Sequence, residues 1–430
     1  MPYLINLVIE GIVTFLGVWW WLILPLFLYP PAAVLYRWWI SWEVWYKEQE
    51  WMMLEITPPG EIPKPFMAMQ DVFQALWGPV YDGANWREMW CEGELDKGPN
   101  WMSFEVVSIA GEVHFYARIL KVWQKVIEAI IHTHYPEAEI IEAEDYVKNI
   151  PQDIPNETFD IRGEDYKLMR EDFYPIKTYK FFEIKPEEID PEKKLDPFSS
   201  LMEAMVKLKQ GEQFWFQFVF VPITNSDIPW YDKAKEKVEE LVKRPKKGKS
   251  KTIAGETVRT LFTEHVPFEQ EKKEEPIIPP EMRLTPGERD IVQGIEEKMA
   301  QQGFNSYIRG LYIYERDAYV PAHSKLSRAY FSHFSTQNLN TIMFLGKTRT
   351  KIHYLFRKRR LRARKQSLLK KYINRFPPSY PARQGVGNMI LTAEELATLF
   401  HFPMKAMELP PGVPRIPAKK GGPPPGIPGE

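Results

Sequence analysis

Two short motifs in the sequence end like a phosphate-binding loop, at residues 248–250 (GKS) and 346–348 (GKT). The complete G-x-x-x-x-G-K-[ST] motif needs another glycine five residues before its second glycine, so that backbone N–H groups can surround a β-phosphate. Lys243 and Thr341 occupy those two positions. The sequence therefore does not predict a nucleotide-binding loop at either motif.

Other residue types that do chemistry are not grouped for it. His132 and His134 lie two residues apart in a predicted helix and so face different sides, and Cys91 has no Cys or His at ligand spacing. The acids of residues 142–145 (EAED) have no nucleophile or second base with them, so a solvent-facing strand edge explains them better than acid–base catalysis. We therefore expect a protein that is not an enzyme and that holds no metal ion or cofactor.

The composition bounds the class of protein. The chain has 430 residues, of which 44% are hydrophobic and one is a cysteine. This length allows two or three domains, and the composition excludes collagen-like, wholly disordered and disulfide-stapled proteins. The lone cysteine fits a reducing compartment. A mean hydropathy of −0.37 excludes a polytopic membrane protein.

One strongly apolar segment lies near the amino terminus. Residues 11–36 carry no formal charge, and a helix over 11–29 would be about 28 Å long, close to the ~30 Å hydrocarbon core of a bilayer. We expect Pro25 to kink this helix and Pro30-Pro31 to end or turn it, because proline cannot donate to the helical hydrogen-bond ladder. The sequence therefore predicts one transmembrane span, in preference to a buried core helix.

The residues that flank this segment predict its orientation. No Lys or Arg precedes it, whereas Arg37 and Lys47 follow it. The positive-inside rule then places the amino terminus outside and the bulk of the chain in the cytoplasm, anchored in the inner (cytoplasmic) membrane. Tryptophans near helical spacing predict a helix at the level of the lipid headgroups, with four residues at the membrane interface: Trp38, Trp39, Trp42 and Trp45.

Strand and helix patterns alternate along the rest of the chain. They predict an α+β fold with two mixed α/β sandwich units, whose antiparallel-rich sheets carry helices on one face. Alternating apolar residues at 214–221 predict a strand with one strongly buried face. Further strands are predicted at 104–120 (a hairpin around residues 110–111), 138–147, 176–184 and 306–314, and helices at 121–135, 197–208 and 286–299.

These patterns divide the chain into seven segments. They are a membrane anchor with an interfacial helix (1–57), a first α+β unit (58–243), a flexible charged linker (244–284), a second α+β unit (285–345), a basic helix (346–380), a short carboxyl-terminal helix (381–403) and a disordered Pro/Gly-rich tail (404–430).

The charges of the chain are unevenly distributed. Residues 318–393 contain sixteen Lys and Arg and no Asp or Glu, so with a net charge of −1 overall the remainder carries −17. Such a density of positive charge calls for an anionic surface. Nucleic-acid phosphates, the anionic inner leaflet of the membrane and the chain's own acidic residues are the three alternatives, and the sequence alone does not separate them.

Residues 356–376 of this region suit a basic helix. Leu361, Leu368, Tyr372 and Phe376 give the helix a narrow apolar stripe, and basic side chains cover most of the rest. The residues predicted to bind a polyanion are Arg357, Lys358, Arg359, Arg360, Arg362, Arg364, Lys365, Lys370 and Lys371.

The carboxyl-terminal helix has a well-defined start. Residues 392–395 form a capping box, and Pro403 ends the helix. Its apolar side chains are too many for a lone solvated helix, which predicts that they dock a partner: Leu396, Leu399, Phe400 and Phe402.

Several segments resemble a known family. The runs GEVHFYARI, YPEAEIIEAEDYV, DPFSSLMEAMVKLKQGEQFWFQ and above all LTAEELATLFHFP followed by PAKKGGPPPGIP are similar to the amino-terminal region of conjugative, type IV secretion-like DNA-transfer coupling ATPases of candidate-phyla-type bacteria. In that family a membrane anchor and a domain of unassigned function precede a hexameric motor ATPase. This sequence departs from the pattern because it lacks the motor, which leaves two alternatives: the motor is a separate polypeptide, or the chain is truncated before it.

The resemblance implies a membrane-anchored, non-catalytic cytoplasmic module of a DNA-translocation system. Such a module would dock a separate motor ATPase, would bind DNA through the basic helix, and could form a homo-oligomer beside a ring-shaped motor. The alternative is a structural scaffold at the membrane surface whose basic helix binds anionic lipid and has no nucleic-acid role.

Overall fold

The computed structural model describes residues 2–60, 62, 64–81, 83–94, 101–181, 196–242, 284–353, 355–380 and 387–403. The GKS motif, the predicted linker up to residue 283 and the predicted Pro/Gly-rich tail lie outside these residues.

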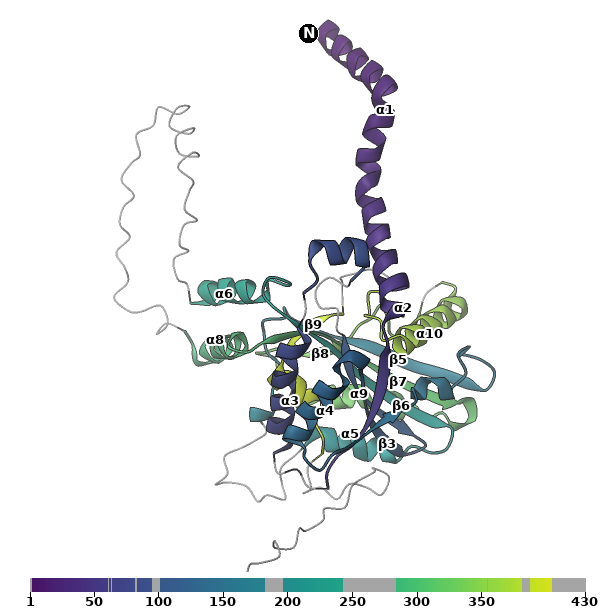
Figure 1. Ribbon diagram of the computed structural model, residues 1–430, viewed down its shortest axis with the longest axis vertical. Coiled ribbons are helices and arrows are strands. Elements are labelled where there is room, and N and C mark those ends of the chain that lie inside the picture. The colour runs from purple at the N-terminus through teal and green to yellow at the C-terminus, as the bar shows by residue number, and fades with distance from the viewer. Residues whose placement is uncertain are drawn as a thin grey trace, which may run out of the picture.

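Nine strands form one antiparallel sheet in the order β4-β1-β3-β2-β6-β7-β5-β8, and β9 pairs with β7 (Figure 1). With the helices around this sheet, the α+β class predicted from the sequence is confirmed. The strands are β1 (Trp51–Thr57), β2 (Met102–Ile109), β3 (Glu112–Leu120), β4 (Glu139–Ala143), β5 (Phe159–Leu168), β6 (Glu212–Ile223), β7 (Gly303–Glu315), β8 (Ile342–Phe344) and β9 (Met389–Thr392).

The strands of the two predicted units belong to this same sheet. β6 of the first unit pairs with β7 of the second over their whole length, from Glu212 opposite Tyr314 to Ile223 opposite Gly303. β1, which the sequence analysis grouped with the membrane anchor, is an interior strand between β3 and β4. The anchor and both units are therefore joined through continuous backbone hydrogen bonding.

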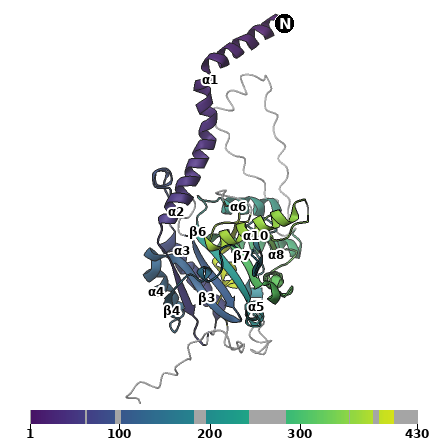
Figure 2. The same cartoon turned by 90° about the vertical axis from the view of Figure 1, so that its right-hand side faces the viewer.

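Helices cover both faces of the sheet (Figures 1 and 2). Residues from α3, α4, α5, α9 and α11 share one hydrophobic core, and α10 packs in a second core on the other face. The helices are α1 (Pro2–Trp39), α2 (Tyr46–Glu48), α3 (Pro65–Val80), α4 (Gln124–His134), α5 (Pro197–Val206), α6 (Trp230–Leu241), α8 (Pro286–Met299), α9 (Leu326–Ser332), α10 (Arg357–Ile373) and α11 (Ala393–Leu399), with π-helical turns η1 (Ile40–Trp45) and η2 (Glu88–Glu92). The described residues also contain five short 3-10 turns: η3 (Lys121–Trp123), η4 (Tyr146–Asn149), η5 (Tyr179–Phe181), η8 (Arg316–Ala318) and η9 (His323–Lys325).

Strand β6 is buried on both faces, not on one face as its alternating pattern predicts. Phe216 and Phe218 lie in the core with α3 and α9, whereas Trp215 lies in the core under α10. Val219 packs in a third cluster with Trp42 of η1. The second face is buried because helix α10 and the end of the amino-terminal helix cover it.

Local signals in the sequence are confirmed where they fix a turn or a cap. The hairpin between β2 and β3 turns at Ala110-Gly111, where Gly111 has φ +93° and an added Cβ would lie 2.7 Å from the carbonyl oxygen of Val206. Thr285 and Thr392 both form the predicted capping boxes, at the starts of α8 and α11.

The predicted strand at 176–184 is wrong in its described part. Residues 176–178 are irregular, and η5 follows them. The backbone N–H of Ile176 donates to Glu395 Oε1 (2.9 Å), and that of Tyr179 donates to Thr398 Oγ1 (3.1 Å). This segment is irregular because side chains of α11 take backbone donors that a strand would pair with a neighbouring strand.

The amino-terminal helix is longer than predicted. α1 continues through Pro25, Pro30 and Pro31 and leads through η1 into α2. Each proline removes one backbone donor, but later residues still make their own hydrogen bonds, so the helix does not end there. The segment Gly17–Glu48 is long and apolar enough to span a membrane, and its most apolar stretch is not buried. Figure 1 shows α1 projecting from the domain.

Candidate polyanion interface

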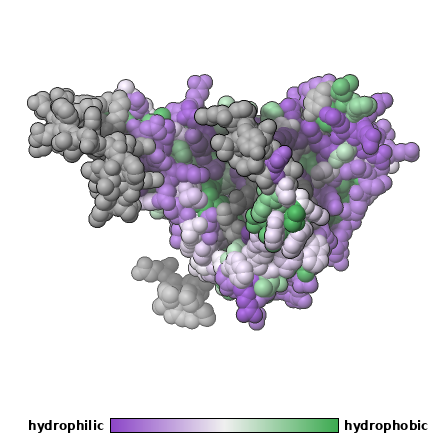
Figure 3. All heavy atoms as spheres, turned by 90° about the horizontal axis from the view of Figure 1, so that it is seen from above, coloured by the Kyte–Doolittle hydropathy of each residue, from purple (hydrophilic) through white to green (hydrophobic). Residues whose placement is uncertain are grey.

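Helix α10 is the predicted basic helix, and it lies at the end of the domain from which α1 leaves (Figures 1 and 2). Leu368, Leu369 and Tyr372 are buried against the sheet residues Trp215 and Leu311. Viewed from the α1 end, the surface around the apolar helix is mostly hydrophilic (Figure 3). The sheet therefore holds α10 by its apolar side and leaves its other sides to solvent.

Six of the nine residues predicted to bind a polyanion are exposed on α10. They are Arg357, Lys358, Arg359, Arg360, Arg362 and Lys370. Within the described part of the chain, Lys358, Arg359 and Arg362 form no ion pair with an acidic side chain. These cations are therefore accessible to an external anion.

The other three predicted residues turn toward the protein and correct the prediction. Lys365 is buried and its Nζ lies 2.5 Å from Asp160 Oδ1. Burial lowers the pKa of Lys365, and the Asp160 carboxylate acts in the opposite direction. Arg364 donates to backbone carbonyl groups of the preceding loop, and Lys371 donates to the carbonyl oxygen of Pro378. Their hydrogen bonds stabilise the packing of α10 and are not offered to a ligand.

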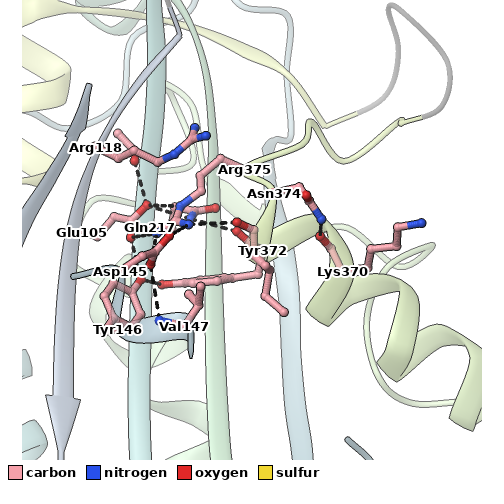
Figure 4. A network of polar contacts seen from close by, with 12 residues as sticks. Glu105, Arg118, Asp145, Tyr146, Val147, Gln217, Lys370, Tyr372, Asn374 and Arg375 are labelled. Atoms are coloured by element: carbon pink, nitrogen blue, oxygen red, sulfur yellow. Dashed lines mark hydrogen bonds and ion pairs between the residues drawn. The ribbon is translucent and has the colours of Figure 1, made fainter. Parts of the chain in front are cut away.

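A buried ion cluster fixes the chain directly after α10 (Figure 4). Arg375 is 2% exposed, and its guanidinium lies 3.0 Å from Glu105 Oε2 and 2.5 Å from Asp145 Oδ2. Glu105 comes from β2, and Asp145 directly precedes η4. One cation of the basic region thus joins two segments that are distant in the sequence.

Neutral side chains complete the hydrogen bonding of Glu105. Tyr146 donates its hydroxyl to Oε2 (2.5 Å), and Gln217 and Ser103 donate to Oε1 (2.9 and 2.7 Å). Burial by itself raises the pKa of Glu105, but the charge and hydrogen bonds of Arg375, together with the hydrogen bonds of Tyr146 and Ser103, lower that pKa to about 2. Glu105 is therefore ionised at neutral pH although it is buried.

The two buried tyrosines of the cluster stay protonated. Burial, followed by the nearby charge of Glu105, raises the pKa of Tyr146 and of Tyr372 well above the ordinary value. Their hydroxyl oxygens are 2.7 Å apart. Because Tyr146 donates to Glu105, Tyr372 donates to Tyr146, and α10 is thereby hydrogen-bonded to the ion cluster.

A second buried ion pair holds the same stretch of chain. Arg309 of β7 and Asp165 of β5 are both 0% exposed, with 2.5 Å between Arg309 Nε and Asp165 Oδ1. Arg309 also donates to the carbonyl oxygen of Phe376 (3.0 Å), and Tyr307 donates to that of Arg375. Strands β2, β5 and β7 therefore all contribute to fixing the carboxyl end of α10.

The tryptophans predicted at the membrane interface occupy different environments. Trp42 is 4% exposed and packs edge-on against Phe376 and Tyr380, with ring centroids 5.2 and 5.4 Å apart. The interfacial prediction is wrong for Trp42, because the chain after α10 covers it. Trp38 and Trp45 are partly buried against the same cluster, whereas Trp39 is exposed.

The predicted partner-docking residues of α11 lie in the hydrophobic core. Leu396, Leu399, Phe400 and Phe402 are each at most 1% exposed. Phe400 stacks on Phe104 of β2 with a centroid distance of 5.0 Å. The prediction is therefore wrong for these four residues: their partner is the sheet of the same chain.

The described residues offer no evident site for a metal ion, since they contain no group of three or more His, Cys, Asp or Glu arranged to hold one. Among the acids of residues 142–145, Asp145 pairs with Arg375. In the GKT motif, Thr348 accepts a hydrogen bond from the backbone of Asp165.

The ion cluster is not among the predicted sites, although the sequence carries a signal for it. Side chains two positions apart on a strand share a face, so Gln217 shares its face with Trp215 and Val219, and Glu105 shares its face with Val107. A polar side chain on a strand face that carries large apolar residues requires a buried partner.

The fold and this site define a class of protein: an α+β domain with a basic helix at the end that carries a long apolar helix. The family model described as "Domain of unknown function (DUF8128)" matches residues 84–412, more than half of the chain. The chain belongs to this family. No curated protein matches the chain.

Proposed function

We propose that this protein is a membrane-anchored, non-catalytic module of a conjugative, type IV secretion-like DNA-translocation system, which binds DNA through α10 and works with a separate motor ATPase. Three features support the proposal: the apolar helix α1, the exposed cations of α10, and the sequence resemblance described above. The proposal assigns no residues to the docking of the motor, because the apolar side chains predicted for this role are in the core.

The observation that carries the proposal is the rigid presentation of cations that form no ion pair with the described residues. Lys358, Arg359 and Arg362 project from a helix whose other end is fixed by buried ion pairs. Such a surface attracts phosphates at any base sequence, and binding releases condensed counterions from the nucleic acid. A translocation module needs this kind of contact, because the DNA must pass through whatever its sequence.

The proposed topology places the amino terminus outside the cytoplasmic membrane and the α+β domain in the cytoplasm. The basic residues that follow the apolar segment, and the cations of α10 at the same end of the domain, agree with this orientation. DNA in the cytoplasm would then have direct access to α10.

Salt-dependent DNA binding by the full-length protein in zwitterionic nanodiscs tests the proposal. The variant Lys358→Gln/Arg359→Gln/Arg362→Gln should weaken binding of single-stranded DNA and lower the slope of log K against log salt by about 2. The matched control, Lys125→Gln/Lys148→Gln/Lys235→Gln, removes the same charge from exposed positions elsewhere and should retain most of the slope. An unchanged slope in the α10 variant would remove DNA from the proposal.

A second candidate function is a membrane-surface scaffold whose α10 binds anionic lipid. The observation that favours it is the position of α10 beside the base of α1 (Figure 2). Nanodiscs with and without phosphatidylserine separate the two functions. If α10 lies on anionic lipid, phosphatidylserine should abolish DNA binding, whereas a DNA-binding helix that faces the cytoplasm should bind DNA in both discs.

A further inference from the structure

A cationic cavity of about 230 Å³ lies at the amino end of α10. Its walls are the segment 324–328, the loop 349–352 and the start of α10, and strands β5 and β7 contribute to its floor. Seven cationic residues line it: Arg162, Lys325, Arg328, Arg349, Lys351, Arg357 and Lys365. Of these, Lys365 is paired with Asp160, as described above.

One carboxylate serves two of these arginines. Among the described residues that line the cavity, Glu164 is the single acid, and it is 4% exposed. Arg328 contacts both of its oxygens, and Arg349 Nε lies 3.5 Å from Oε2. Burial and the charge of Arg328 together lower the pKa of Arg349. By contrast, the hydrogen bonds of Glu164 raise the pKa of Arg328, so this carboxylate compensates the charge of Arg328 and leaves that of Arg349 less well compensated.

Other cations around the cavity have no acidic partner of their own. Lys325, Lys351 and Arg357 are exposed and form no ion pair within the described part of the chain. The guanidinium group of Arg162 lies over the ring of Tyr319, with 4.6 Å between its Cζ atom and the ring centroid. With Asp160 included, seven cations thus face two carboxylates, which leaves a strong local excess of positive charge.

The start of α10 adds to this excess. Its first four residues, 357–360, are all Arg or Lys, and its first turn contains no acid. Cations at a helix amino terminus oppose the helix dipole, and no side chain of the described residues caps this end, where Phe356 has φ +58°. An anion in the cavity would reduce the repulsion between the cations and would also stabilise the uncapped end of the helix, because guanidinium groups and exposed N–H groups would donate to it.

We propose that this cavity binds a phosphate monoester, and that its ligand is the 5′-phosphorylated end of a DNA strand. The inference rests on the proposed function. A terminal phosphate carries nearly two negative charges and has three free oxygens, which suits a recess with guanidinium groups on several walls. A phosphodiester is substituted on both sides and suits the open surface of α10. The cavity and the helix surface thus bind different parts of one strand.

The test compares two single-stranded oligonucleotides that differ only in a 5′-phosphate or a 5′-hydroxyl group, with full-length protein in zwitterionic nanodiscs. The wild-type protein should bind the phosphorylated strand about tenfold more tightly. Arg349→Gln should reduce this preference at least threefold. Lys325→Gln should do the same, and it changes an exposed residue that does not contact Glu164. The control Lys358→Gln lies outside the cavity and should weaken both strands alike.

The outcomes separate this inference from the proposed function. Equal binding of the two strands by the wild-type protein, with a salt slope that still depends on α10, would overturn the cavity proposal and leave the proposed function standing. A preference that both cavity variants retain would also overturn it. If neither strand binds but vesicles with phosphatidic acid do, and Arg349→Gln weakens that binding, DNA is excluded both as the ligand and as the function.

Discussion

The two ends of α10 carry the same residue types and use them differently. Lys365, in the middle of the helix, and Arg375, two residues past its carboxyl end, are buried and paired with Asp160, Glu105 and Asp145. At the amino end, four consecutive cations are exposed. The comparison shows that a high density of Lys and Arg does not by itself define a ligand site, because part of that charge holds the helix in place.

The difference between the two ends comes from distant parts of the chain. Glu105 lies 270 residues before Arg375, and Asp160 lies 205 residues before Lys365. Acids of the sheet meet α10 at its middle and the chain just past its carboxyl end, whereas the amino end of the helix extends past them. The buried ion pairs hold the exposed amino end of α10 in one position. A surface that is already ordered loses less conformational entropy when a ligand binds to it.

The largest expected effect is that of Arg375→Ala. It leaves Glu105 and Asp145 without their cation, and Glu105 is fully buried, so the free energy of unfolding should fall by about 3–5 kcal/mol. Urea unfolding followed by circular dichroism measures this loss. Arg359→Ala, at the exposed end, is the matched control. If the two variants lost a similar free energy of unfolding, the buried and the exposed cations would not differ in their contribution to stability.

Acid should weaken the same cluster. The pKa of Glu105 is about 2 in the folded protein, below its ordinary value of 4.5, so the stabilisation is complete above pH 4.5 and is lost as pH falls toward 2. The expected loss is about 3 kcal/mol. In Glu105→Gln, the free energy of unfolding should depend less steeply on pH across this window. If the pH dependence of the variant matched the wild type, Glu105 would not be the group that titrates.

Lys365→Ala should have an intermediate effect. Its loss leaves the carboxylate of Asp160 largely buried without its closest cation, which should lower the free energy of unfolding by about 1–2 kcal/mol. Lys358→Ala, about two helical turns before Lys365 and exposed, is the control. An equal effect of the two substitutions would show that the Lys365–Asp160 pair contributes nothing specific.

The smallest effect on stability is expected for the exposed end. Arg359→Gln and Arg362→Gln should each change the free energy of unfolding by less than about 0.5 kcal/mol, because neither side chain has an ionic partner in the described part of the chain. DNA affinity measured on the same samples should fall. A large loss of stability would show that these residues, like the buried cations, hold α10 in place.

Features fixed by neighbouring residues could be predicted from the sequence. The turn at Gly111, the capping boxes that start with Thr285 and Thr392, and the basic helix all follow from local patterns, and the structure has each of them. In each case the residues that decide the conformation lie within a few positions of one another.

Features that depend on distant contacts could not be predicted in the same way. The pattern of α11 indicates an apolar helix, but not that Phe400 meets Phe104. The tryptophan run indicates an interface, but not that Trp42 packs against Phe376, which lies more than 300 residues later. Apolar residues in a sequence show that a surface is covered, and only the fold shows what covers it.

The route of the chain from α1 into the sheet has a mechanical consequence. Only residues 49 and 50 separate the end of α2 from β1, and Trp42 is clamped by the chain that follows α10. No flexible linker therefore separates the domain from α1, and the orientation of the domain relative to this helix is fixed. Any pull or twist on the apolar helix reaches an interior strand directly, and force from a load held at the basic helix would travel back along the same path.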